Sequence, residues 1–134
     1  MTALPSATSS STSVPLIGVL RALLLAEAVA TLVLSIYLSL LAGADAEAET
    51  SLRFAAGASF LFAIFAAVAS RGARRRRGWA WTMAAILQVL LAIGTGVAVM
   101  TAEWHPAYLI GFGLAAVVMV VLSTGPVRSA LGQD

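Results

Sequence analysis

The sequence predicts an all-α fold, a four-transmembrane-helix antiparallel bundle with a disordered N-terminal tail. Composition is the first indication, because 60% of the 134 residues are hydrophobic and only 10% are charged, whereas soluble domains carry about 25% charged residues. A chain this short has too little volume to hide so much apolar surface from water. Apolar residues also gather into four segments, each near the ~20 residues that cross the hydrocarbon core of a bilayer.

The order of the elements follows from local signals. Residues 1–13 are mostly Ser and Thr with no charged side chain, and such a segment cannot bury enough apolar surface to fold, which predicts a disordered tail. We expect a membrane domain over residues 14–126 and a short cytoplasmic tail over residues 127–134. The four helices are expected at about residues 15–42, 52–70, 79–101 and 106–124. Lipid offers the backbone no hydrogen-bond partner, so each crossing should be helical, and short connections make neighbouring helices antiparallel.

Proline and glycine mark the ends of these predicted helices. Pro15 suits the first turn of the first helix, and Gly43 suits its end. Pro106 opens the fourth segment, and Gly125 followed by Pro126 closes it.

Arginine placement predicts the orientation. The chain has eight basic residues, all of them Arg, and a four-pass arrangement puts seven on one side and only Arg53 on the other. The positive-inside rule counts basic residues near span ends, so both termini are expected in the cytoplasm, with the protein in the plasma (inner) membrane. Most of the count comes from one cluster, namely Arg71, Arg74, Arg75, Arg76 and Arg77. We expect it to be a topology anchor and a contact for anionic lipid headgroups. It is too small a surface for nucleic acid.

Small residues indicate how the helices pack, because helix association in lipid depends on close approach. The second predicted helix carries a stripe at four-residue spacing, made of Ala55, Ser59, Ala63 and Ala67. Similar pairs occur in the third and fourth helices, Ala92 with Gly96 and Gly111 with Ala115. We interpret these as packing faces.

Glu27 is the only acidic residue inside a predicted span. At a rise of about 1.5 Å per residue it lies at a depth similar to that of Gln88 on the parallel third helix, and Thr31 lies one turn away on the same face. A charged acid at the bilayer centre costs about 2.5–3.5 kcal/mol. One interpretation is an interhelical hydrogen bond of about 1 kcal/mol that fixes which faces meet. The other is a carboxylate that binds a proton or a cation in a cavity.

Two family resemblances bear on these alternatives. The stretch LLLAEAVATLVL resembles the first helix of the small multidrug resistance transporters, which implies a proton- and drug-binding role for Glu27. Basic residues followed by GWAWTMAAILQVLLAIG and LIGFGLAAVVMVVLSTGPVRSALG resemble a group of small four-helix actinobacterial membrane proteins of unknown function. The second resemblance rests on the Arg-rich loop, Trp79-Ala80, Gln88 and Pro126-Val127-Arg128, and departs at Trp81. It implies the four-helix architecture.

Enzyme chemistry is not expected. His105 is the only histidine, and with Glu103 it gives too few ligands for a metal. No Cys is present, which excludes disulfides and thiolate chemistry. No cofactor is expected. We therefore predict a non-catalytic accessory, assembly or membrane-organising protein, whose partners are lipids and either itself or a larger membrane complex. The alternative is a small proton-coupled transporter that uses Glu27.

Overall fold

The computed structural model describes residues 6–101 and 106–133, and over these residues it contains helices and no strands. The all-α class is thereby confirmed. The helices are α1 (Ser6–Ala42), α2 (Glu49–Arg74), α3 (Gly78–Thr101), α4 (Ala107–Ser123) and α5 (Gly125–Ala130).

Helices α1 and α2 each begin earlier in the sequence than expected. Helix α1 begins at Ser6, so residues 6–13 are helical where we expected a tail without structure. Elongation of an existing helix adds one hydrogen bond per residue fixed, so a polar segment can continue it. Helix α2 begins at Glu49, which lies in the first turn and forms a 2.6 Å ion pair with Arg53 one turn later. An acid at a helix N-terminus and an i,i+4 ion pair both favour this extension.

The C-terminal residues also differ from the expected tail. Helix α4 ends at Ser123, as Gly125 and Pro126 predicted, because Thr124 turns the chain with an extended ψ of 138°. The chain then forms α5, in which Val127 is fully buried, and Leu131 just beyond it is fully buried too. Two apolar residues at i,i+4 spacing give α5 one face that packs against the core.

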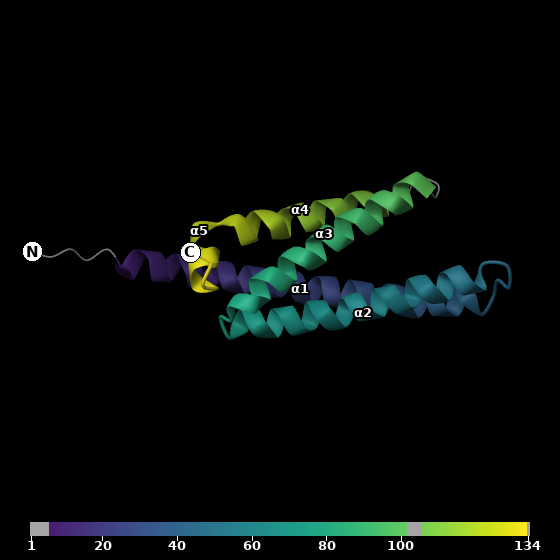
Figure 1. Cartoon of the computed structure of the whole chain (residues 1–134), viewed down its shortest axis with the longest axis horizontal. Coiled ribbons are helices and arrows are strands. Elements are labelled where there is room, and N and C mark those ends of the chain that lie inside the picture. Colours follow the sequence, from purple (N-terminus) through teal and green to yellow (C-terminus); the bar gives the residue numbers. More distant parts are fainter. Residues whose placement is uncertain (1–5, 102–105, 134) are drawn as a thin grey trace, which may run out of the picture.

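The four long helices form two hairpins (Figure 1). Helix α1 packs along α2, and α3 packs along α4, while the two hairpins are joined by the short turn between α2 and α3. In this turn Arg76 adopts a left-handed φ of 50°. The hairpins lie together near this turn and diverge toward the other end. A single bundle closed along its whole length is therefore not what the structure shows.

The hydrophobic core lies at the end where the hairpins meet. Its members come from all five helices and include many alanines. They are Ile17, Leu20, Leu24, Ala28, Ala66, Ala69, Ala73, Ala80, Ala84, Leu87, Val118, Leu122, Val127 and Leu131. The core stops near Ala28 and Leu87, at the level where the hairpins begin to diverge.

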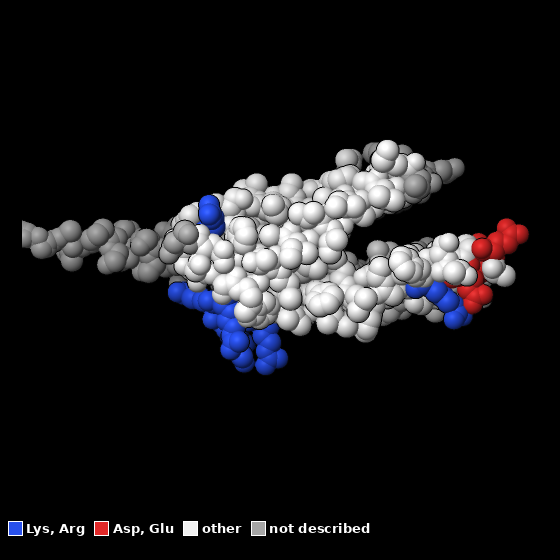
Figure 2. All heavy atoms as spheres, viewed as in Figure 1, with Lys and Arg blue, Asp and Glu red and all other residues white. Residues whose placement is uncertain are grey.

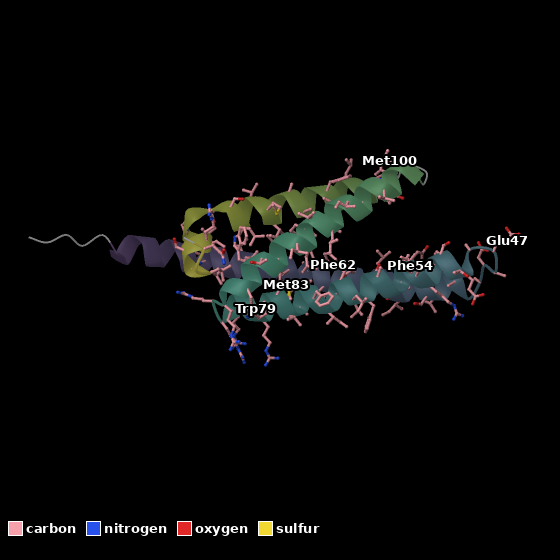
Figure 3. All side chains as sticks on the ribbon, viewed as in Figure 1. Glu47, Phe54, Phe62, Trp79, Met83 and Met100 are labelled. Atoms are coloured by element: carbon pink, nitrogen blue, oxygen red, sulfur yellow. The ribbon has the colours of Figure 1, made fainter. Side chains whose placement is uncertain are left out.

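The outer surface is apolar. Leu40, Phe54, Met100 and Ile110 are between 71% and 87% exposed, and Phe54 and Met100 point outward in Figure 3. Three helices are long and apolar enough to cross a membrane, over Pro15–Ala42, Glu49–Arg74 and Gly78–Met100. The apolar part of α4, Tyr108–Ser123, is shorter. Three of the four expected crossings thus have the length and apolar composition to span a membrane, and the count of four stays a prediction.

Charge is divided between the two ends of the structure (Figure 2). Arginine side chains gather at the end where the hairpins meet, and acidic side chains gather at the far tip of the α1–α2 hairpin. The acids at that tip follow Ala42 in the α1–α2 connection and at the start of α2, and the only basic residue near them is Arg53.

Candidate functional site

Glu27 belongs to the core face of α1. The buried residues of this helix, Ile17, Leu20, Leu24 and Ala28, recur every three or four positions, which is the spacing of one helix face. Glu27 lies on that face at the edge of the core, and it is 1% exposed. The acid therefore points inward, between the hairpins, and not toward the lipid-facing surface.

The structure brings Glu27 and Gln88 together. The Gln88 side-chain amide donates a 2.9 Å hydrogen bond to Oε2 of Glu27, and Gln88 is also 1% exposed. Helices α1 and α3 make few close backbone approaches, so these two long side chains bridge the space between them. The other carboxyl oxygen of Glu27, Oε1, and the amide oxygen of Gln88, Oε1, are buried without a hydrogen-bond partner among the described residues.

Thr31 lies beside this pair without bonding to either side chain. Its hydroxyl donates to the backbone carbonyl of Glu27 at 2.7 Å and to that of Ala28 at 3.2 Å. Such a bond to the preceding turn is common for Thr in helices. Of the three predicted polar residues, the structure joins Glu27 and Gln88, and places Thr31 one turn nearer the open end.

A cavity of about 550 Å³ begins at Thr31 and lies between the diverging hairpins; we call it the interhairpin cleft. Figure 2 shows the opening between the two arms, and Phe62 lies near its inner end in Figure 3. Many of the lining residues are small: Ala55, Ala58 and Ser59 from α2, Gly94 and Ala98 from α3, and Gly111 from α4. Neither Glu27 nor Gln88 lines the cleft.

The predicted small-residue stripe of the second helix is divided between different surroundings. Ala55 and Ser59 line the cleft, Ala63 is buried, and Ala67 is exposed. On the other hairpin, Gly111 lies against Thr95, since a Cβ at Gly111 would lie 3.2 Å from Oγ1 of Thr95, and the atom nearest a Cβ at Gly96 would be Cζ of Phe112 at 3.9 Å. These contacts do not pair the two expected small-residue faces directly. Trp81 donates a 2.9 Å hydrogen bond to the Leu122 carbonyl and so also ties α3 to α4.

The predicted arginine cluster is also divided. Arg71, Arg74 and Arg75 line a second cavity of about 680 Å³ at the closed end of the structure; we call it the basic pocket. Arg77 lines a smaller hollow beside Trp79, which Arg71 and Arg75 also line, and Arg76 lines neither cavity.

Arg21 from α1 completes the wall of the basic pocket. This could not be predicted from the sequence, which does not determine which face of α1 meets α2. The relevant contact is the 3.4 Å hydrogen bond from the Ser70 hydroxyl to the Arg21 carbonyl.

Among the residues that the structure describes, no group of three or more His, Cys, Asp or Glu side chains is placed so that it could hold a metal ion. Glu103, Trp104 and His105 lie outside those residues. No protein-family model, no curated protein and no solved structure matches the chain, so the two family resemblances stay predictions. Three long apolar helices, an apolar outer surface and a division of charge between the ends define the class: this is a helical membrane protein.

Proposed function

We propose that this is a four-pass protein of the plasma membrane, with both termini in the cytoplasm, that acts as a non-catalytic accessory or assembly subunit. It would hold a transmembrane helix of a larger membrane complex in the interhairpin cleft. The observation that carries the proposal is the cleft itself, whose walls come from both hairpins and are rich in Ala, Gly and Ser.

Residue size favours a helix over lipid as the occupant of the cleft. Lipid chains fill an apolar surface whatever the size of the side chains, whereas small residues let the backbones of two helices approach closely. Ala58 on α2 and Ala98 on α3 belong to opposite walls of the cleft. A guest helix could therefore contact both hairpins at short range.

The arginine distribution supports the proposed orientation. Arg21 lines the basic pocket at the closed end together with arginines of the α2 C-terminus, and Arg128 belongs to α5. Arg53, near the start of α2, is paired with Glu49. Basic residues near span ends are retained on the cytoplasmic side. The cleft would then open toward the outer half of the membrane.

Site-specific photo-crosslinking tests the accessory role. A photoreactive residue at Leu34, which lines the cleft, is compared with one at Val33, which is 60% exposed on the same helix and does not line it. The proposal expects one membrane protein to crosslink from Leu34 at least several-fold more strongly than from Val33, and to copurify at a fixed stoichiometry. Equal crosslinking to lipid from both positions would contradict it.

A second candidate function is a small proton-coupled transporter. It is favoured by the buried, unpartnered Oε1 of Glu27, which could carry a proton, and by Thr31, which lies between that acid and the cleft. Glu27→Gln keeps the shape and removes the titratable group. This function expects loss of pH-dependent cation binding in a folded Glu27→Gln protein, and unchanged binding would eliminate it.

A further inference from the structure

The basic pocket has an unusual charge balance. Four of its seven lining residues are Arg21, Arg71, Arg74 and Arg75, and no lining residue is acidic. Glu49, the acid that forms an ion pair among the described residues, is paired with Arg53 at the start of α2. It therefore does not neutralise the arginines of the basic pocket. Four positive charges drawn around one hollow repel each other, so the pocket is suited to an anion.

Arg21 is the member that shows a missing partner. Its Nε is buried, and it has no hydrogen-bond partner within the described part of the chain. A buried donor without an acceptor is unfavourable, and a guanidinium group binds phosphate oxygens through two parallel hydrogen bonds. A phosphate in the pocket would give Nε of Arg21 the acceptor that the protein does not supply.

The apolar lining residues of the basic pocket favour a phospholipid over a free phosphate as its ligand. Leu25 follows Arg21 by one helical turn on α1, and Ala67 precedes Arg71 by one turn on the antiparallel α2. Both residues are therefore one turn farther from the arginine-rich end. The pocket thus has a basic part and an apolar part in the order in which a phospholipid presents its phosphate and its acyl chain.

We propose that the basic pocket is a binding site for one anionic phospholipid. Its phosphate lies among the guanidinium groups of Arg21, Arg71, Arg74 and Arg75, and an acyl chain runs along Leu25 and Ala67 toward the membrane centre. The long side chain of Arg21 allows its charged group to reach the headgroup region from inside the span. This site is separate from the interhairpin cleft and does not depend on the proposed accessory function.

Native mass spectrometry of the full chain, delipidated in a neutral detergent, tests the site. The probes are phosphatidylglycerol, phosphatidylcholine and inorganic phosphate. We expect one phosphatidylglycerol to bind at least tenfold more tightly than phosphatidylcholine, and Arg21→Gln and Arg71→Gln each to weaken it about fivefold. Arg76→Gln is the matched control, because it removes the same charge from the same end without lining the pocket, and it should change binding less than twofold.

Three results would overturn the proposal. If Arg76→Gln weakens binding as much as Arg21→Gln, the attraction is a diffuse charge effect. If inorganic phosphate at equal concentration displaces phosphatidylglycerol, the pocket is a free-phosphate site. If Leu25→Asn leaves phosphatidylglycerol binding unchanged, no acyl chain lies along α1. Helix content by circular dichroism verifies folding, and Arg74→Gln, at an exposed position, replaces Arg21→Gln if the latter does not fold.

Discussion

Gln88 on α3 reaches Glu27 on α1 with a hydrogen bond of 2.9 Å, across 61 positions of sequence. The pair lies at the edge of the core, next to Ala28 and Leu87, where the hairpins begin to diverge (Figure 1). It is thus the last polar link between α1 and α3 in the described residues before the cleft opens.

The first prediction concerns the strength of this link. Gln88→Leu leaves the Glu27 carboxyl buried without its donor, and we expect the free energy of unfolding to fall by about 1–2 kcal/mol. The double variant with Glu27→Leu should recover part of that loss, because both polar groups are then gone. Reversible unfolding in detergent micelles, followed by circular dichroism, measures all four members of the cycle. Additive losses in the double variant would show that the pair is not coupled.

The second prediction concerns the turn between α2 and α3. A Cβ at Gly72 would lie 2.6 Å from Cη2 of Trp79 and 2.9 Å from Cβ of Ala80, so Gly72→Ala forces α3 away from α2. We expect a loss of about 1–3 kcal/mol in the free energy of unfolding. Gly57→Ala in the same helix is the control, because nothing lies within 4 Å of its Cβ position. That change should be neutral or stabilise the protein by up to about 1 kcal/mol, and equal effects at the two positions would contradict the packing.

The third prediction concerns the docking of α5. Leu131 is fully buried against the core, so Leu131→Ala should cost about 2–5 kcal/mol and release α5 before the rest unfolds. Amide hydrogen exchange of Arg128 and Gln133, whose N–H groups donate to the Thr124 and Arg128 carbonyls, should accelerate at least tenfold. Ser129→Ala, at an exposed position, should leave exchange unchanged. Slow exchange in the Leu131→Ala protein would mean that other contacts hold α5.

The fourth prediction concerns orientation in the membrane. The native chain has no Cys, so single cysteines placed by Ala46→Cys and Ser129→Cys report independently on the two ends. With the native arginines, a membrane-impermeant maleimide added to intact cells should label only the cysteine at position 46. Replacing all four of Arg74 to Arg77 with Gln should produce a mixed population, because the charge bias is reduced. Labelling at position 129 in the native background would reverse the proposed orientation.

The sequence predicted the helical class because apolar segments of this length can only be helices in lipid. It also predicted that Glu27 and Gln88 lie at similar depth, because the rise per residue fixes depth along a span. Depth does not fix rotation, however. The buried alanines of α2 include Ala56, Ala66 and Ala69. Of the regular stripe that we expected, only Ala63 is buried, because an Ala-rich helix presents small residues on every face.

For the same reason, the position of Arg21 in the basic pocket could not be predicted, because the sequence does not determine how α1 is rotated about its axis. Only the packing of α1 on α2, through the Ser70 hydroxyl and the Arg21 carbonyl, brings its side chain to the basic pocket. Helix α5, in contrast, had a readable signal. Val127 and Leu131 are apolar at i,i+4 spacing directly after a proline, which is typical of a short amphipathic helix.

Because the Glu27–Gln88 hydrogen bond lies where the hairpins diverge, a small change in its geometry produces a larger displacement at the far end of α3. From Gln88 to Thr101 the arm of α3 extends for about 20 Å at 1.5 Å per residue. A rotation of roughly ten degrees about the link moves the end of that arm by about 3.5 Å, close to the contact distance of about 3.5–4.0 Å between two carbon atoms. A substitution at position 27 or 88 that rotates α3 by this amount would change the width of the interhairpin cleft. It could therefore alter the binding of the proposed guest helix, although neither residue lines the cleft.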